Sequence, residues 1–195
     1  MSRFIKRIKP AFEKTVSPII DIFHKLKISP NLLTVSGIIF TAVGSYFLYR
    51  EEFFLAGVFI LFGNLCDALD GTLARKYNQS STFGAFLDSV VDRISDFLPL
   101  IAIAGIYRHD EVMFFISLSA VVFSFLVSYT RARAEGLGIN CSVGLFERPE
   151  RSAVLIVSIF MGIIDIAVVV VALGAAITAL QRILCVYKKT LPEAG

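Results

Sequence analysis

The chain has no tryptophan, few charges and only three cysteines among its 195 residues. Charged residues make up 18% of it, against about 25% in soluble domains, and its mean hydropathy is +0.75. This composition excludes an ordinary soluble domain and favours an integral membrane protein, although the usual interfacial tryptophan belt is missing. The formal net charge of +3 is too small to indicate a nucleic-acid-binding protein.

The cysteines follow none of the spacings that indicate metal or redox chemistry. Cys66, Cys141 and Cys185 form no C-x-x-C pair and have no metal-like spacing with His24 or His109. We therefore predict that all three are packing residues, because free cysteine behaves as a small hydrophobic side chain.

The sequence is rich in long apolar runs, and a membrane-spanning helix needs about 20 apolar residues. Candidate spans cover residues 32–49, 53 to about 74, 83–107, 112 to about 134, and the long run 152–187. The last run has 36 residues, and residues 162–165 are its best candidate turn, which divides it into two spans. We predict an all-α integral membrane protein with six transmembrane helices that form one domain over residues 29–195.

Lys and Arg residues predict the orientation of these helices. With six spans both termini lie on the same side, and that side receives all of the 19 Lys and Arg residues except Arg50, Arg93 and Arg108. We therefore predict a multi-pass protein of the cell membrane with both termini in the cytoplasm.

Residues 1–28 form a juxtamembrane segment with a helical pattern. Apolar residues recur there at steps of three and four, at Ile5, Ile8, Phe12, Val16, Ile19, Phe23 and Leu26. Lys and Arg fill much of the opposite face, which predicts an interfacial amphipathic helix lying on the cytoplasmic membrane surface. A helix that packs against the protein body explains the pattern equally well.

Four aspartates fall inside the predicted second and third spans. An ionised carboxylate in hydrocarbon is costly unless it is paired, hydrated or bound to metal, so a functional site is the first hypothesis. Asp67 and Asp70 share one helix face, and Asp88 and Asp92 share another. Asp67 lies about 21 Å along its span, and the second pair lies roughly 8 to 14 Å into the next, which brings both pairs to one depth near the cytoplasm.

Carboxylate ligands alone favour a hard divalent cation such as Mg²⁺ or Mn²⁺ over zinc. Gly71, Ala74 and Gly84 leave a groove beside these carboxylates, and Arg75 suits a diphosphate oxygen. Small residues and a terminal arginine also have ordinary explanations in membrane helices, but their combination with the aspartates predicts a site for a phosphate ester. An ion or proton transporter is the alternative from another class, and it predicts acidic residues at several depths.

These residues carry a family resemblance. The pattern Asp67-x2-Asp70-Gly71-x2-Ala74-Arg75-x8-Gly84-x3-Asp88-x3-Asp92 matches the signature of the CDP-alcohol phosphotransferase (phosphatidyltransferase) family at each fixed position. The resemblance implies that an alcohol hydroxyl attacks the β-phosphate of a CDP-linked lipid and releases CMP. For the four carboxylates together we predict two Mg²⁺ ions, with Mn²⁺ as a substitute. The resemblance also implies a homodimer. The metal ligands that it implies are Asp67, Asp70, Asp88 and Asp92, of which Asp92 is also the catalytic base. The CDP-lipid residues that it implies are Pro30, Asn31, Leu32, Leu33, Gly71, Arg75 and Ser81.

Four further arginines gather in the predicted fourth connection and towards the end of the last span, at Arg131, Arg148, Arg151 and Arg182. Bidentate guanidinium groups suit a phosphomonoester, although positive-inside bias explains any single one of them. The loop segments resemble those of the phosphatidylinositol-phosphate and archaetidylinositol-phosphate synthases of the family. This resemblance implies inositol 1-phosphate as the acceptor, bound through these arginines. Glycerol 3-phosphate is the alternative, whereas serine would not need them.

Asp96 extends the acidic stripe one turn beyond Asp92. Arg93 lies three residues before Asp96 and is suited to a buried ion pair with it. We predict that Asp96 is structural.

Overall fold

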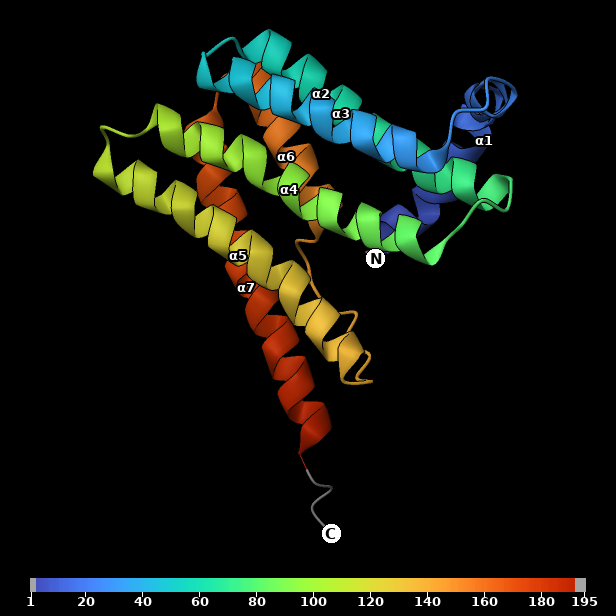
Figure 1. Cartoon of the computed structure of the whole chain (residues 1–195). Coiled ribbons are helices and arrows are strands. Elements are labelled where there is room, and N and C mark those ends of the chain that lie inside the picture. Colours follow the sequence, from blue (N-terminus) through green and yellow to red (C-terminus); the bar gives the residue numbers. More distant parts are fainter. Residues whose placement is uncertain (1–2, 192–195) are drawn as a thin grey trace.

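The computed structural model describes residues 3–191, and their side chains from residue 11 onward. Seven helices follow one another along this part of the chain (Figure 1): α1 (Arg3–Lys25), α2 (Pro30–Tyr49), α3 (Phe53–Lys76), α4 (Thr82–Ile106), α5 (Glu111–Gly136), α6 (Arg148–Met161) and α7 (Ile164–Thr190). The predicted all-α fold is confirmed for the described residues. Residues 192–195 of the predicted catalytic domain lie outside them.

Six of the helices form a closed ring. α2 packs against α3 and α4, α4 packs against α5, α5 against α7, α7 against α6, and α6 returns to α3. α3 and α4 are consecutive in sequence, yet each packs mainly on α2, and they make few close backbone contacts with each other. The C-terminal halves of α5 and α7 extend together beyond the other helices (Figure 1). The space between α3 and α4 is therefore left to side chains, and these two helices carry the four aspartates.

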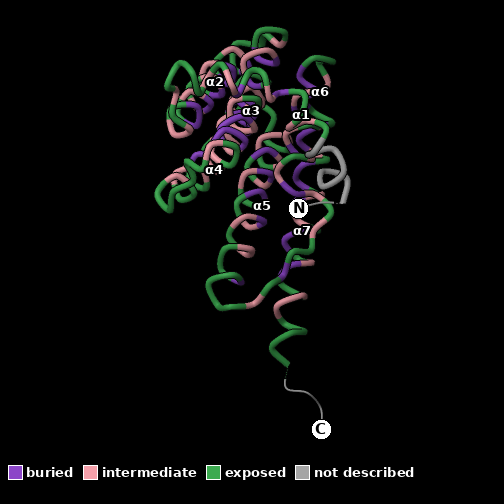
Figure 2. Tube along the Cα trace, turned by 90° about the vertical axis from the view of Figure 1, so that its right-hand side faces the viewer, coloured by how far each residue is buried: buried purple, intermediate pink, exposed green. Residues whose placement is uncertain are grey.

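The largest apolar cluster lies at the end of the ring that is away from the α3–α4 connection. Its fully buried members include Leu48 of α2, Ile103 of α4, Ile159 of α6 and Val168 of α7. Figure 2 shows buried positions on the inward sides of the helices and exposed positions around the outside. This cluster thus holds one end of the bundle together, and the four aspartates lie towards the other end.

Within residues 3–191, four helices are long and apolar enough to cross a membrane: α2, α3, α5 and α7. In α4 the aspartates and Arg93 interrupt the apolar sequence, and α6 has 14 residues, about 21 Å, which is shorter than a hydrocarbon core of about 30 Å. The six predicted helices are present, whereas the count of six spans stays a prediction. The predicted turn between the last two is confirmed, because α6 ends at Met161 and Gly162 adopts a left-handed conformation with φ 69°.

α1 packs against the protein body through one of its faces. Val16 and Ile20 are buried there in a cluster with Leu33, Leu69 and Leu73. Other apolar residues of α1 are exposed, namely Ile19, Ile22 and Leu26. The packing of Ile5 and Ile8, which belong to the predicted apolar face, lies outside the described side chains. One of the two explanations for the sequence pattern, a helix packed on the body, is thus observed, and exposed apolar side chains remain for a membrane surface.

Polar contacts fasten α1 to the end of α3. The Asp21 carboxylate accepts hydrogen bonds from the Lys76 ammonium and, at 2.6 Å, from the Tyr77 hydroxyl. These donors hold the pKa of Asp21 below its ordinary value, and the same carboxylate raises the pKa of Tyr77. Because the pKa of Asp21 is lowered, its contribution to docking is present at neutral pH and is lost only as the pH falls into the acidic range.

Small residues bring α2 and α3 into close contact one turn before the aspartates. A Cβ atom on Gly63 would press against the Thr41 hydroxyl and lie 2.9 Å from the carbonyl oxygen of Gly37. A Cβ atom on Gly44 would lie 2.7 Å from Cγ1 of Ile60. This close approach sets the position of α3, and with it Asp67, against α2.

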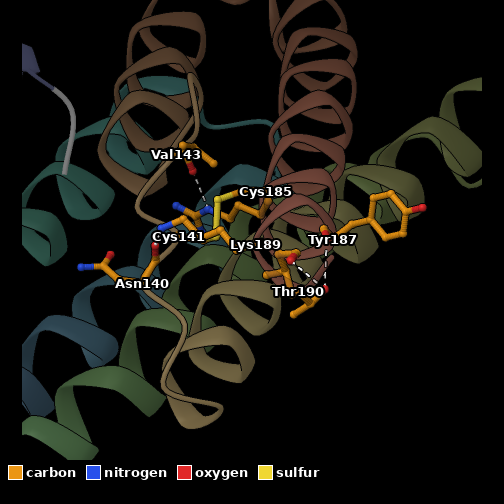
Figure 3. The surroundings of a disulfide bond; sticks show 9 residues. Asn140, Cys141, Val143, Cys185, Tyr187, Lys189 and Thr190 are labelled. Carbon is orange, nitrogen blue, oxygen red and sulfur yellow. Dashed lines mark hydrogen bonds between the residues drawn. A yellow bond between two sulfur atoms is a disulfide. The ribbon is translucent and has the colours of Figure 1, made fainter. Parts of the chain in front are cut away.

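Cys141 and Cys185 form a disulfide bond that ties the α5–α6 loop to α7 (Figure 3). Their Cα atoms are 6.1 Å apart, within the ordinary range for a disulfide. Beside the bond, the Lys189 ammonium donates to the Asn140 carbonyl oxygen at 2.6 Å. The prediction that all three cysteines are packing residues is wrong for this pair, because the loop folds back onto α7 and no local spacing encodes that contact. Cys66 is a free thiol.

We expect the double variant Cys141→Ser/Cys185→Ser to lose about 2 to 4 kcal/mol of stability, because the bond restrains a long loop in the unfolded chain. Thermal unfolding in detergent measures this loss. Cys66→Ser is the matched control, and its unfolding temperature should stay near that of the wild type. Thiol titration of the denatured, unreduced protein should find one free thiol. Three free thiols would contradict the bond.

Candidate active site

Three aspartates meet between α3 and α4. Carboxylate oxygens of Asp67, Asp70 and Asp88 lie within 4.8 Å of one another. Asp70 is 5% exposed and accepts a hydrogen bond from the Thr34 hydroxyl, and Oδ1 of Asp67 is buried with no hydrogen-bond donor among the described residues. A group of carboxylates with an unsatisfied buried oxygen fits a hard divalent cation such as Mg²⁺ or Mn²⁺.

Asp92, one turn beyond Asp88, joins this group through an arginine of α6. Nη1 of Arg148 is 2.8 Å from Oδ2 of Asp67 and 2.9 Å from Oδ1 of Asp92. Nη1 of Arg93 also lies near this carboxylate, 3.9 Å from Oδ2 of Asp92. The four predicted aspartates therefore form one continuous cluster, and the first residue of α6 supplies positive charge to it.

A cavity of about 160 Å³ lies beside Asp70 and Asp88. The residues predicted for the CDP-lipid that line it are Pro30, Asn31, Gly71, Arg75 and Ser81. Thr34 and Gln79 also line the cavity, and sequence reasoning missed both. Thr34 lies one helical turn after Pro30, and this spacing was the available signal for it.

Leu32 and Leu33, which were also predicted for the CDP-lipid, do not line this cavity. Leu32 is 54% exposed, and its backbone N–H donates to the Ser29 hydroxyl at the start of α2. Leu33 is buried in the cluster beneath α1. Successive residues of a helix point in different directions, so four residues in a row cannot all face one site.

The start of α4 shapes the opposite wall of this cavity. The Ser81 hydroxyl caps α4 by accepting the Gly84 N–H at 2.9 Å. A Cβ atom on Gly84 would lie 3.0 Å from Oγ of Ser81 and 3.2 Å from Oδ1 of Asn31. A side chain at position 84 would therefore crowd polar groups that line the cavity.

Arg75 lies at the edge of the same cavity and is shared with α1. Its Nη2 is 2.9 Å from Oε1 of Glu13, and the Arg75 side chain is half-exposed. An exposed ion pair contributes at most about 1 kcal/mol, so an anionic ligand can replace Glu13 as the partner of Arg75 at little cost.

A second cavity, of about 480 Å³, reaches Asp92. All four arginines predicted for the acceptor phosphate line it: Arg131 of α5, Arg148 and Arg151 of α6, and Arg182 of α7. Positions far apart in the sequence are thus brought to one place by the ring of helices. Sequence reasoning missed Glu147, which also lines this cavity. An acidic residue inside a basic loop was the available signal.

Arg182 is the most fully engaged of the four arginines. It is 2% exposed, its Nε donates to the Val143 carbonyl oxygen at 2.9 Å, and its Nη2 donates to Oε1 of Glu147 at 2.7 Å. Its Nη1 donates to the Val127 carbonyl oxygen. By contrast, the Arg131 side chain is 43% exposed and pairs with Glu135 on the surface. The four arginines of this cavity therefore include a buried one that holds the α5–α6 loop and an accessible one.

Asp96 does not pair with Arg93, so that prediction is wrong. Its carboxylate accepts a hydrogen bond from Nη2 of Arg151, and its Oδ1 lies 3.3 Å from Nε of Arg148. The Arg93 guanidinium instead donates back to the Ser89 carbonyl oxygen on its own helix. α6 supplies the counter-charge to Asp96, and no spacing within α4 could have indicated it.

Known proteins share this combination of helices and residues. The family model for CDP-alcohol phosphatidyltransferase matches residues 27–185. The chain belongs to the CDP-alcohol phosphatidyltransferase family. It is therefore a membrane-associated transferase of phospholipid biosynthesis, as the signature predicts, and the transporter alternative is no longer needed to explain the aspartates.

Three relatives of this phosphatidyltransferase cover nearly all of the chain. An uncharacterized protein of Aquifex aeolicus is 45% identical over 185 residues, which are 94% of each chain. The archaetidylinositol phosphate synthase of Pyrococcus horikoshii is 36% identical over 182 residues, which are 92% of this chain and 94% of the relative.

The third relative is the phosphatidylinositol phosphate synthase of Mycobacterium tuberculosis. Its crystal structure with CDP-DAG bound is 27% identical, with a TM-score of 0.81 over 93% of this chain and 96% of that one. Its structure with manganese and citrate is 28% identical, with a TM-score of 0.81 over 91% of this chain and 90% of that one.

Proposed function

We propose that the protein transfers a phosphatidyl- or archaetidyl-type group from a CDP-linked lipid to a hydroxyl group of inositol 1-phosphate, with Mg²⁺ as the metal, and releases CMP. One observation carries this proposal: two cavities meet the same carboxylate cluster. Asp70 and Asp88 line the cavity that holds the signature residues, and Asp92 lines the cavity that holds the arginines. A donor and an acceptor can therefore approach the cluster from separate cavities.

The smaller cavity is assigned to the CDP part of the donor. Arg75 binds the diphosphate through its guanidinium and releases Glu13. Gly71 and Gly84 leave the backbone of α3 and α4 open to the nucleotide, and Pro30 and Asn31 form the wall that α2 contributes. The CDP-DAG in the crystal structure of the Mycobacterium tuberculosis enzyme supports the same class of donor here.

Asp67, Asp70 and Asp88 would hold the divalent cations, with Asp92 as a further ligand. Two Mg²⁺ ions bound there would neutralise diphosphate oxygens and stabilise the charge that develops on the leaving CMP. The manganese in the second crystal structure supports Mn²⁺ as a substitute.

Asp92 is assigned as the base because it is the signature aspartate that faces the arginine-lined cavity. The acceptor hydroxyl gives its proton to a carboxylate oxygen of Asp92 while its own oxygen bonds to the β-phosphorus of the donor. The bond from that phosphorus to the bridging oxygen of CMP breaks, and the electron pair leaves with CMP. Arg148, 2.9 Å from Oδ1, orients the Asp92 carboxylate.

The acceptor is assigned from the charges around the larger cavity. Arginines suit its phosphate group, and the carboxylates of Glu135 and Glu147 on the same wall suit ring hydroxyl groups. The archaetidylinositol phosphate synthase among the relatives supports inositol phosphate. Glycerol 3-phosphate is the second candidate, because it is also a phosphomonoester with free hydroxyl groups.

CMP release by the purified protein tests this function. With Mg²⁺ or Mn²⁺, and with CDP-diacyl or CDP-dialkyl lipid, we expect turnover with inositol 1-phosphate, none with free inositol, and complete loss on chelation with EDTA. No CMP with any phosphorylated or neutral alcohol would overturn the enzymatic assignment. Turnover with glycerol 3-phosphate alone would keep the chemistry and overturn the acceptor.

We propose the same membrane arrangement that the sequence predicts, with six spans and both termini in the cytoplasm. The exposed Ile19, Ile22 and Leu26 of α1 then contact the membrane surface while Val16 and Ile20 pack on the body. A homodimer is part of this proposal.

A further inference from the structure

Asp96 is a fifth carboxylate beside the cluster, and the signature does not include it. It follows Asp92 by four residues, so both lie on one face of α4. Its side chain is 8% exposed, and its charge is met by Arg148 and Arg151 of α6. A buried carboxylate needs such partners, and here both come from another helix.

Asp96 lies at ion-pair distance from one edge of the Arg148 guanidinium, whose Nε forms no hydrogen bond among the described residues. Nε of Arg148 lies 3.3 Å from Oδ1 of Asp96, while Nη1 lies 2.8 Å from Asp67 and 2.9 Å from Asp92. The guanidinium is planar and rigid, so an electrostatic attraction at its Nε edge favours the orientation in which Nη1 reaches Asp67 and Asp92. The charge of Asp96 therefore favours the orientation that Arg148 has in the cluster.

Asp96 also contacts a second arginine of α6. Arg151, which is 2% exposed, donates to the second oxygen of the same carboxylate and, at 3.3 Å, to the Phe146 carbonyl oxygen. Two guanidinium groups thus share one carboxylate. Arg148 and Arg151 both line the cavity assigned to the acceptor, so Asp96 is linked to two groups that suit a phosphomonoester.

We propose that Asp96 is a positioning residue for the acceptor half of the reaction. It holds Arg148 towards Asp67 and Asp92 and fastens the first turn of α6 to α4. Asp96 is not among the described residues that line either cavity, so it acts through Arg148 and does not touch substrate. This inference rests on the proposed function.

The variant Asp96→Asn tests the proposal, because it removes the charge and keeps the size. We expect kcat/KM for the acceptor to fall about 10- to 100-fold, as for other residues that orient a ligand of a metal site, with the KM for the CDP-lipid nearly unchanged. Asp96→Glu should recover part of the loss. Asp110→Asn is the matched control: it makes the same change at the exposed N-cap of α5 and should behave as wild type.

A double-mutant cycle separates positioning from a general structural role. In an Arg148→Gln background, Asp96→Asn should lower the acceptor kcat/KM little further, because the arginine through which Asp96 acts is already absent. Mn²⁺ binding without substrates adds a readout independent of turnover. There we expect Asp96→Asn to weaken Mn²⁺ binding several-fold, since an Arg148 without its anchor competes with the cation for Asp67 and Asp92, and we expect this weakening to vanish in Arg148→Gln.

If the fold-losses in acceptor kcat/KM from Asp96→Asn and Arg148→Gln simply multiply in the double variant, the proposal is overturned. An Asp96→Asn protein with the same acceptor kcat/KM as Asp110→Asn would also overturn it. If Asp96→Asn fails to fold, Asp96→Glu replaces it in the cycle, and the same two outcomes would overturn the proposal. A wild-type protein that releases no CMP with any acceptor refutes the proposed function, and the Mn²⁺ cycle still decides the role of Asp96.

Discussion

Replacing Asp92 by asparagine is expected to lower kcat by about 10³-fold, the typical value of a positioned general base. The amide keeps the shape of the carboxylate, so the ion pairs of Arg148 with Asp67 and Asp96 should survive. What disappears is the group that we propose takes the proton from the acceptor hydroxyl. Because Asp92 does not line the cavity assigned to CDP, binding of the CDP-lipid should change little.

Single-turnover CMP release measures the chemical step, and equilibrium binding of a CDP-lipid measures the donor site. Asp110→Asn again serves as the control for a carboxylate-to-amide change. Turnover above a tenth of the wild-type rate would remove Asp92 from the role of base. Loss of the folded protein or of donor binding would make the residue structural.

Periodicity and spacing were sufficient for the parts of this protein that depend on one helix. The paired faces of Asp67 with Asp70 and of Asp88 with Asp92 follow from 3.6 residues per turn. The end of α6 follows from Gly162, which adopts the left-handed conformation that closes a helix. In both cases the information lies within a few neighbouring residues.

Contacts between distant helices could not be read in this way. Arg93 is the nearest arginine to Asp96 in sequence, yet Arg148 and Arg151 reach it from α6. The bond between Cys141 and Cys185 depends on the return of a loop to α7 for the same reason. Pairing each side chain with its nearest opposite charge in sequence favours a partner on the same helix. In a ring of helices, partners from distant parts of the sequence lie equally close in space.

The span count shows a different kind of limit. Hydropathy treats α4 as a poor membrane helix because Asp88, Asp92 and Asp96 lie in it, although these residues face α3 and α6 inside the ring. Composition alone does not separate a charge that faces lipid from one that faces a partner. The site that makes this helix functional is what weakens its hydropathy signal.

Breaking the buried pair of Arg182 and Glu147 should have the largest effect on stability. Arg182→Met removes hydrogen bonds to two backbone carbonyl groups and to Glu147, and it leaves that buried carboxylate without its hydrogen-bonded guanidinium. Removal of one partner of a buried ion pair costs about 3 to 5 kcal/mol. Glu147→Gln should cost less, since the amide oxygen still accepts from Arg182.

Arg131→Met is the matched comparison, because it removes an arginine that lines the same cavity but is half-exposed. Its stability should change by less than about 1 kcal/mol, whereas the KM for the acceptor should rise. Chemical unfolding in detergent and CMP release with varied inositol 1-phosphate measure the two quantities on the same proteins. An Arg182→Met protein as stable as wild type, with only a raised acceptor KM, would show that Arg182 binds the phosphate directly. A large loss of stability in Arg182→Met, together with a raised acceptor KM in the stable Arg131→Met, would instead make Arg182 a structural residue. It would then build the wall of the cavity in which Arg131 and Arg148 meet the acceptor.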